Sequence, residues 1–192
     1  MYKITNEKTK FKLDYVPWPK EYPIKPETFV EFSYDDGGFK LHFVSYETDL
    51  RAVNTKHNTE VCQDSCLEFF AQFNYPTDKN YINFEVNPKG VALVAYQPGR
   101  GESTYVAPED IDTLGIIPEI FEDRWELTYY VPVSFIKKYI PSYEHKKGNV
   151  IRANFYKCGD KTNHMHYVAF NNVGTPEPDF HRPEYFAEFE LA

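Results

Sequence analysis

The chain is poor in the residues and segments that mark several common classes of protein. Its 192 residues include three cysteines, two tryptophans and two methionines. No apolar run approaches the ~20 residues that cross a bilayer. Three cysteines leave at least one thiol free, which argues against a disulfide framework. No Gly-rich phosphate loop follows a candidate strand and no Gly-x-Ser-x-Gly motif occurs, so nucleotide-binding and serine-hydrolase functions have no support.

Positive charge is also in deficit. The formal net charge is −8 at pH 7, which argues against nucleic acid or an anionic membrane as a partner, because both select basic surfaces. The sequence begins at Met1 without the apolar segment and small-residue cleavage site of a signal peptide. The chain as written is therefore expected to be cytoplasmic. A secreted chain from which the signal had been removed would look the same, and both localisations stay open.

Aromatic residues, by contrast, are abundant. There are 16 tyrosines and 16 phenylalanines and no long Ala, Leu, Glu and Lys tract, a composition that favours strands over a helical bundle. The length predicts one domain over residues 1–192. Four prolines near the start exclude a regular helix or central strand around them, so we expect residues 1–28 to be a Pro-rich lead-in that packs across the body. These prolines are Pro17, Pro19, Pro23 and Pro26.

Alternation of apolar and polar residues predicts the strands. Residues 29–34 and 39–44 flank an Asp-Asp-Gly-Gly turn and predict a β-hairpin. Further strands are expected at residues 67–73, 81–87, 91–96, 125–131, 150–156 and 185–191. The result is about nine strands joined by short turns, which predicts an all-β fold, an antiparallel β-sandwich or jelly roll.

Two other segments complete this prediction. Residues 99–123 show little periodicity and predict an extended loop with one short strand; loops of this length are often functional. Residues 132–139 begin with proline and have apolar spacing suited to two helical turns. They are the one good helix candidate.

Three predicted strands carry polar side chains opposite their apolar faces. These are Glu68 and Gln72, then Asn83, Glu85 and Asn87, then Arg152, Asn154 and Tyr156. If the three strands are neighbours, these side chains form one polar sheet face. A solvated outer face explains the pattern equally well. The mixture of amide, carboxylate, guanidinium and phenol nevertheless resembles a surface that binds the hydroxyl groups of a sugar.

Asp64 and Glu68 form a second pattern, one carboxylate just before a strand and one inside it. The pair could bind a hydroxyl, hold Arg51 or Arg152, or ligate Ca²⁺, and structural ion pairing is the simple alternative. A glycoside hydrolase would need two acids across a cleft, at a distance that the sequence does not give. This enzymatic alternative stays open.

Two motifs contain residue types that can ligate a metal. His164-Met165-His166 contains haem-ligand residue types, with two histidines on one face of a strand. A haem or metal-binding sandwich is therefore another alternative. Cys62 and Cys66 have no matching pair of ligands later in the chain, whereas a structural zinc site needs four ligands. We expect them to be packing residues.

Four blocks of sequence resemble a known family. Residues 64–70, 81–87, 154–160 and 180–186 are similar, in order and spacing, to stand-alone proteins related to family 9 carbohydrate-binding modules. The likeness spans Phe29 to the C-terminus. It implies a β-sandwich, a role in carbohydrate recognition or catabolism, a functional link to a glycan-degrading enzyme, and Ca²⁺ as a candidate cofactor.

The better-known modules of this family hold a terminal sugar between two tryptophan rings. Trp18 and Trp125 lie outside the matching blocks of this chain, so a clamp would be built from other rings, whose faces also stack on a sugar. The candidates are Tyr96, Tyr167, Phe170 and Phe180.

We therefore expect non-catalytic binding of a small saccharide or glycan end. A glycoside hydrolase, a haem or metal protein, and a protein-interaction module are the alternatives. The candidate carbohydrate-binding residues are Asp64, Glu68, Asn83, Glu85, Tyr96, Arg152, Asn154, Tyr156, Phe170 and Phe180.

Overall fold

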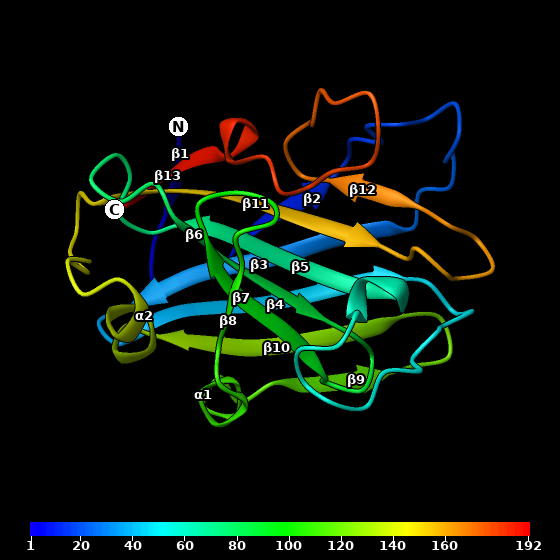
Figure 1. Ribbon diagram of the computed structural model, residues 1–192, viewed down its shortest axis with the longest axis horizontal. Helices are drawn as coiled ribbons and strands as arrows, with labels where there is room; N and C mark the ends of the chain where they lie inside the picture. Colours follow the sequence, from blue (N-terminus) through cyan, green and yellow to red (C-terminus); the bar gives the residue numbers. More distant parts are fainter.

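The computed structural model describes residues 1–192 as two β-sheets packed face to face (Figure 1). The larger sheet has the order β1-β13-β11-β5-β6-β7-β8, with β12 beside β11. Its strands are β1 (Tyr2–Ile4), β5 (Cys66–Gln72), β6 (Tyr81–Val86), β7 (Ala92–Gln97), β8 (Thr104–Tyr105), β11 (Val150–Cys158), β12 (Tyr167–Ala169) and β13 (Ala187–Leu191). The antiparallel β-sandwich predicted from the sequence is confirmed.

The smaller sheet has five strands in the order β2-β3-β4-β10-β9. These are β2 (Thr9–Leu13), β3 (Glu27–Asp35), β4 (Gly38–Tyr46), β9 (Ile117–Ile120) and β10 (Trp125–Pro132). Two short α-helices, α1 (Pro108–Asp112) and α2 (Val133–Tyr139), and two 3-10 turns, η1 (Val61–Gln63) and η2 (Pro183–Tyr185), lie in the connections. None of the helices is long and apolar enough to cross a membrane.

The main core lies between the two sheets and contains 34 buried residues. It is rich in aromatic rings, because alternate positions of β3, β5, β6 and β11 contribute phenylalanines to it. Phe155 on β11 is central: its ring lies 5.4 Å from that of Phe69 and 5.3 Å from that of Phe32 on the facing sheet. The apolar faces predicted for residues 67–73 and 150–156 are those that pack here.

The β3-β4 hairpin closes as the sequence predicts, and close packing fixes its glycine. Oδ1 of Asp35 accepts hydrogen bonds from the backbone N–H groups of Gly37 and Gly38. A Cβ at Gly38 would lie 2.2 Å from the carbonyl oxygen of Val131. The turn therefore brings its backbone against β10, where only glycine fits.

The structure corrects three details of the sequence prediction. Thirteen strands replace the expected nine or so. Residues 1–28 are not a plain lead-in, since β1 and β2 precede the prolines and pair with β13 and β3. Residues 99–123 hold β8, α1 and β9 rather than a loop with one strand. Each missed element has two to five residues, too short for its periodicity to be recognised.

Candidate functional site

The three polar strand faces are neighbours. In the register of the larger sheet, Glu68 on β5 lies opposite Glu85 on β6 and opposite Tyr156 on β11. One step along, Asn83 and Asn154 flank Phe70. The polar rows therefore share the outer face of the eight-stranded sheet, the arrangement that the sequence left open.

This outer face is covered rather than solvated. Residues 170–182, between β12 and η2 and here named the covering loop, pack across it together with Trp18. Trp18 Nε1 donates a hydrogen bond of 2.7 Å to the carbonyl of Thr175. Phe180 stacks on Tyr156 with ring centres 4.1 Å apart. These rings belong to a second core of 11 buried residues outside the main one.

A cavity of about 140 Å³ remains between the sheet and its cover. It is rich in polar and ionisable groups, and two aromatic residues also line it. The lining residues are Cys62, Glu68, Glu85, Arg100, Cys158, Asp160, Tyr167, Pro178, Asp179, Phe180 and His181. Typical small-molecule sites have about 300–1,000 Å³, so this cavity suits one small ring rather than a chain.

Three carboxyl groups form the acidic side of the cavity. Burial, followed by the charge of Glu85, raises the pKa of Glu68 well above its ordinary value. Burial raises the pKa of Glu85 to about 7, although the amide of Asn83 donates to its Oε1 at 2.9 Å and opposes this change. Burial also raises the pKa of Asp160. Burial therefore favours the protonated form of each carboxyl, and a protonated carboxyl can both donate and accept hydrogen bonds.

Arg100, Asp179 and His181 form the opposite side. Nε and Nη2 of Arg100 each lie 2.8 Å from Oδ1 of Asp179, and the same oxygen accepts from the backbone N–H of His181 at 3.1 Å. Burial, followed by the positive charge of Arg100, lowers the pKa of His181 to about 4. The imidazole is therefore neutral at pH 7.

The tautomer of His181 follows from its neighbours. Its Nδ1 lies 3.3 Å from the amide nitrogen of Gln97, which can only donate, and 2.9 Å from the hydroxyl of Tyr81. Nδ1 is therefore the acceptor, and Nε2 carries the proton. Nε2 lies 3.8 Å from Oε1 of Glu85. The N–H donor of neutral His181 and the carboxyl of Glu85 thus face the same part of the cavity. Such a pair can bind a hydroxyl group in a fixed direction.

Comparison with known proteins identifies the family. The sequence pattern of the family described as Carbohydrate-binding family 9 matches residues 3–191. The chain belongs to carbohydrate-binding family 9. Membership confirms the resemblance found in the sequence and makes non-catalytic carbohydrate binding the function of this sandwich. The comparison with curated proteins finds no match.

Solved structures agree with the family assignment. A protein of Bacteroides uniformis proposed to bind carbohydrate is 28% identical, with a TM-score of 0.87 over 96% of this chain and 87% of that one. A family 9 carbohydrate-binding module of Caldicellulosiruptor kristjanssonii was solved with glucose and with cellotriose. These two structures are 11% identical to this chain, with TM-scores of 0.64 and 0.65, and cover 99% of it and 94% and 92% of their own lengths. They share the fold.

The family 9 sandwich brings three of the predicted site residues to the cavity: Glu68, Glu85 and Phe180. Tyr156 and Asn83 lie directly beside them but support the site from beneath. Tyr156 is fully buried under Phe180, and its hydroxyl donates to the Phe180 carbonyl at 3.3 Å. Asn83 is fully buried and fixes Glu85.

Asn154 fastens the covering loop. Its Oδ1 accepts from the N–H of Asn171 and its Nδ2 donates to the carbonyl of the same residue, both at 2.9 Å. The adjacent Phe170 packs against the main core beside Phe11 and Phe155, with ring centres 5.4 and 5.8 Å away. Both residues hold the loop in place and neither lines the cavity.

Three predicted residues lie elsewhere. Arg152 reaches Gln72 at 3.2 Å and stacks over the ring of Tyr75. The hydroxyl of Tyr96 contacts Asp78 and Asn80. Asp64 is fully buried in the connection between η1 and β5. None of the three lines the cavity.

The surroundings of Asp64 do not fit Ca²⁺. Its two oxygens accept from the backbone N–H groups of Val53 and Asn54 and from the side-chain amides of Asn54 and Asn87, all at 3.0 Å. N–H donors satisfy a carboxylate, whereas Ca²⁺ requires six to eight oxygen ligands. Asp64 instead anchors the segment before η1.

The histidine motif is also used internally. Nδ1 of His166 lies 2.6 Å from the carbonyl of His164, and its Nε2 lies 2.7 Å from the amine of Lys157. Lys157 in turn pairs with Glu47 at 2.9 Å. Both ring nitrogens of His166 are therefore engaged, and the two histidines do not present a joint ligand pair.

Among the charged and imidazole side chains of the cavity, four were missed by sequence reasoning: Arg100, Asp160, Asp179 and His181. All four lie in connections between strands, where no period of two marks them, although Asp160 and His181 stand in two of the blocks that resemble the family. The available signal was the density of charged and aromatic residues in positions 178–186, from which only Phe180 was selected.

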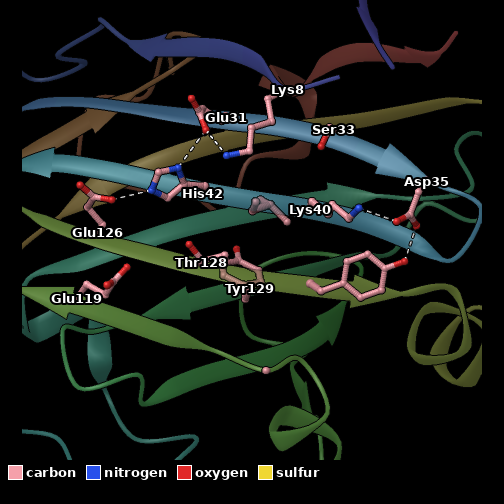
Figure 2. A pocket seen from close by; sticks show the side chains of 13 residues that line it. Lys8, Glu31, Ser33, Asp35, Lys40, His42, Glu119, Glu126, Thr128 and Tyr129 are labelled. Atoms are coloured by element: carbon pink, nitrogen blue, oxygen red, sulfur yellow. Dashed lines mark hydrogen bonds and ion pairs between the residues drawn. The ribbon is translucent and has the colours of Figure 1, made fainter. Parts of the chain in front are cut away.

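The outer face of the five-stranded sheet carries a larger, open groove of about 660 Å³ (Figure 2). Its charged groups pair with one another along β3, β4 and β10. His42 lies between Glu31 and Glu126, at 3.0 and 2.8 Å. Lys40 and the hydroxyl of Tyr130 both contact Asp35, at 2.8 and 2.6 Å. Nothing in the sequence pattern pointed to this groove.

Proposed function

We propose that the cavity between the eight-stranded sheet and its cover binds the terminal ring of a small saccharide. The observation that carries this proposal is the convergence of hydroxyl-binding groups in a space sized for one ring: Glu68, Glu85 and Asp160 on one side, and Arg100, Asp179 and His181 on the other. Sugar hydroxyls are simultaneous donors and acceptors, and a set that mixes protonatable carboxyls with fixed N–H donors matches them.

The aromatic part of the site is smaller than a two-tryptophan clamp. Tyr167 and Phe180 line the cavity with ring centres 6.0 Å apart and planes at 75°. One face of Phe180 is covered by Tyr156. The rings are therefore perpendicular and offer one apolar wall rather than two parallel plates. Hydrogen bonds then supply most of the selectivity, since a buried polar site rejects a ligand that leaves its groups unpaired.

The glucose and cellotriose complexes of the Caldicellulosiruptor kristjanssonii module support a saccharide of this kind. The net charge of −8 further supports a neutral sugar over nucleic acid or an anionic membrane. We also propose that the protein works with a glycan-degrading enzyme in polysaccharide catabolism, where recognition of a chain end would be useful.

The test is a thermal-shift screen with mono- and oligosaccharides, followed by calorimetric titration of any ligand found. A ligand that binds only the folded state raises the melting temperature by mass action. Arg100→Ala removes an exposed part of the cavity wall and should weaken binding about tenfold or more. Glu126→Gln in the open groove is the matched control and should leave affinity unchanged.

The opposite pattern would overturn the proposed location. If Glu126→Gln weakened binding and Arg100→Ala did not, the sugar would lie on the five-stranded sheet. Assays for reducing-sugar release on the same ligands would reveal hydrolysis, which the proposal does not expect.

A further inference from the structure

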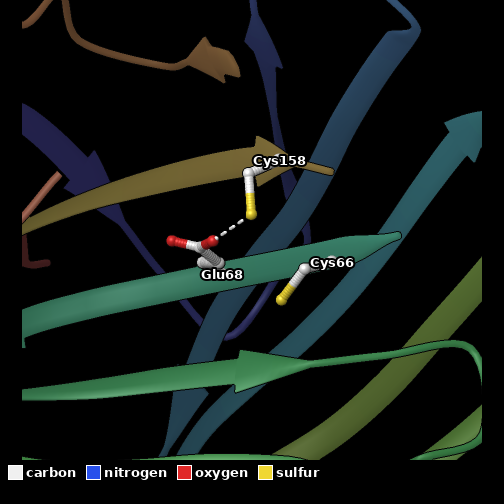
Figure 3. Close-up of side chains that lie close together, drawn as sticks. All are labelled: Cys66, Glu68 and Cys158. Carbon is white, nitrogen blue, oxygen red and sulfur yellow. Dashed lines mark hydrogen bonds between the residues drawn. The ribbon is translucent and has the colours of Figure 1, made fainter. Parts of the chain in front are cut away.

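Two thiols that the proposed sugar site does not use lie next to Glu68: Cys158 lines the cavity, and Cys66 is fully buried beside it. Cys66 on β5 lies directly opposite Cys158 on the antiparallel strand β11. Glu68 is two residues further along β5, so the period of a strand places it on the same face. Figure 3 shows the three side chains on these two strands, with the Cys158 thiol hydrogen-bonded to Glu68.

The distances between these ligand atoms suit a single ion. The two sulfurs and a carboxylate oxygen all lie within 4.8 Å of one another, and Sγ of Cys158 is 2.8 Å from Oε1 of Glu68. Zinc binds thiolate at about 2.3 Å and carboxylate at about 2.0–2.2 Å in tetrahedral geometry, which places two sulfur ligands about 3.8 Å apart. The three ligand atoms therefore already lie near the spacing that one ion requires.

We propose that Cys66, Cys158 and Glu68 form a binding site for Zn²⁺ or a similar thiophilic divalent ion. Thiolate ligands select such metals over Ca²⁺ and Mg²⁺, which prefer oxygen. Cys158 and Glu68 line the cavity, so the ion can enter from it. Three protein ligands leave the fourth tetrahedral position open toward the cavity for water.

Further carboxyl groups surround the cluster. Glu85 lies opposite Glu68 on β6, and Asp160 lines the same cavity, yet the nearby cations are turned elsewhere. Lys157 points to the other face and pairs with Glu47, and Arg100 pairs with Asp179.

The sequence alone did not reveal this site. Cys66 and Cys158 are far apart along the chain, and only the pairing of β5 with β11 brings them together. Cys62, which is closer to Cys66 in sequence, is half-buried on η1 and belongs to the cavity wall.

The test is a titration of metal-free, reduced protein with Co²⁺, followed by Zn²⁺. We expect one Co²⁺ per chain, a near-ultraviolet band from thiolate-to-cobalt charge transfer, and loss of this band when Zn²⁺ displaces Co²⁺. Because two thiols must ionise, binding should release protons and strengthen as pH rises. Proton release in weak buffer gives a second readout that needs no sugar.

Variants assign the ligands. Cys66→Ser and Cys158→Ser should each weaken metal binding by at least roughly a hundredfold, and Glu68→Gln by roughly tenfold. Cys62→Ser is the matched control, which removes a thiol from the same cavity and should keep the band. Near-ultraviolet circular dichroism checks that each variant is folded. The two cysteines lie on different strands, so one variant still tests the site if the other fails to fold.

Two outcomes would overturn the metal site. One is a reduced wild-type protein that binds no Co²⁺ or Zn²⁺ at micromolar concentrations. The other is a band that survives in Cys66→Ser and Cys158→Ser but disappears in Cys62→Ser. Saccharide titration of the metal-free protein is separate, since neither the sugar proposal nor the metal proposal requires the other.

Discussion

The outer face of the eight-stranded sheet is covered, whereas the outer face of the five-stranded sheet is open, although both carry polar side chains at alternate strand positions. On the open face, acids and bases pair with one another across an accessible groove. On the covered face, Trp18 and the covering loop bury the acids of β5 and β6 and leave one small cavity. The same strand pattern therefore produces a solvated surface in one place and a binding site in the other.

The covered face differs because the chain returns to it twice. The Pro-rich segment around Trp18 and the covering loop meet at one end of the sandwich, where blue and orange segments lie side by side in Figure 1. Burial of a carboxyl without a cation raises its pKa, while pairing with a cation lowers it. The cover thus changes both the shape and the chemistry of the face, and the following variants test this difference.

The largest effect is expected from Phe70→Ala. The ring of Phe70 is fully buried under the cover, with ring centres of His181 and Tyr156 at 4.9 and 5.2 Å. Truncating a buried phenylalanine costs about 3–5 kcal/mol of unfolding free energy. Urea unfolding measures this cost, and Thr128→Ala on the open face is the control, expected within about 0.5 kcal/mol of wild type. A cost below about 1 kcal/mol for Phe70→Ala would mean that the cover is not a second core.

Removal of the loop fastener should have the next largest effect. Asn154→Ala leaves the backbone N–H and carbonyl of Asn171 without their partners, which costs about 1–3 kcal/mol when such groups are buried. Relative to wild type, the substitution should accelerate hydrogen exchange more in residues 170–182 than in β5 or β6. Equal acceleration throughout the chain would instead indicate global destabilisation, and the loop would not be an independent cover.

The two faces should also respond to pH in opposite directions. The pKa of Glu85 is raised to about 7, so its stabilising contribution is complete below the ordinary pKa of about 4.5 and is lost as pH rises through 7. Hydrogen bonds from Lys40 and Tyr130 lower the pKa of Asp35 to about 2, so its stabilising contribution is present above its ordinary pKa and lost as pH falls toward 2.

Substitution separates these two contributions. Relative to wild type, Glu85→Gln should gain unfolding free energy between pH 5 and pH 8, on the order of 2 kcal/mol for a buried carboxyl. Asp35→Asn should have a lower unfolding free energy than wild type at pH 5, and this difference should disappear as pH falls to 2. Stability is measured by urea unfolding at each pH. Parallel curves for wild type and Glu85→Gln would show that Glu85 ionises like an exposed acid.

This contrast also explains what the sequence could and could not predict. Alternation placed Glu68, Asn83 and Asn154 on the correct face of the correct strands, because a period of two is a local property. Whether that face meets water depends on segments far along the chain, such as Trp18 and the covering loop. Tyr156 and Asn154 have the pattern of surface residues and are fully buried, so periodicity alone could not separate supporting from lining residues.

The smallest effect is expected on the open face, from His42→Ala. His42 lies between Glu31 and Glu126, but each acid keeps a second cation, Lys8 at 2.8 Å and Arg124 at 2.6 Å. Because partly exposed ion pairs contribute about 0–1 kcal/mol, the substitution should cost less than about 1 kcal/mol. Salt screens such pairs, so the cost measured by urea unfolding should shrink between low and high ionic strength. A cost above about 2 kcal/mol that persists in salt would place the groove among buried networks and remove the contrast between the two faces.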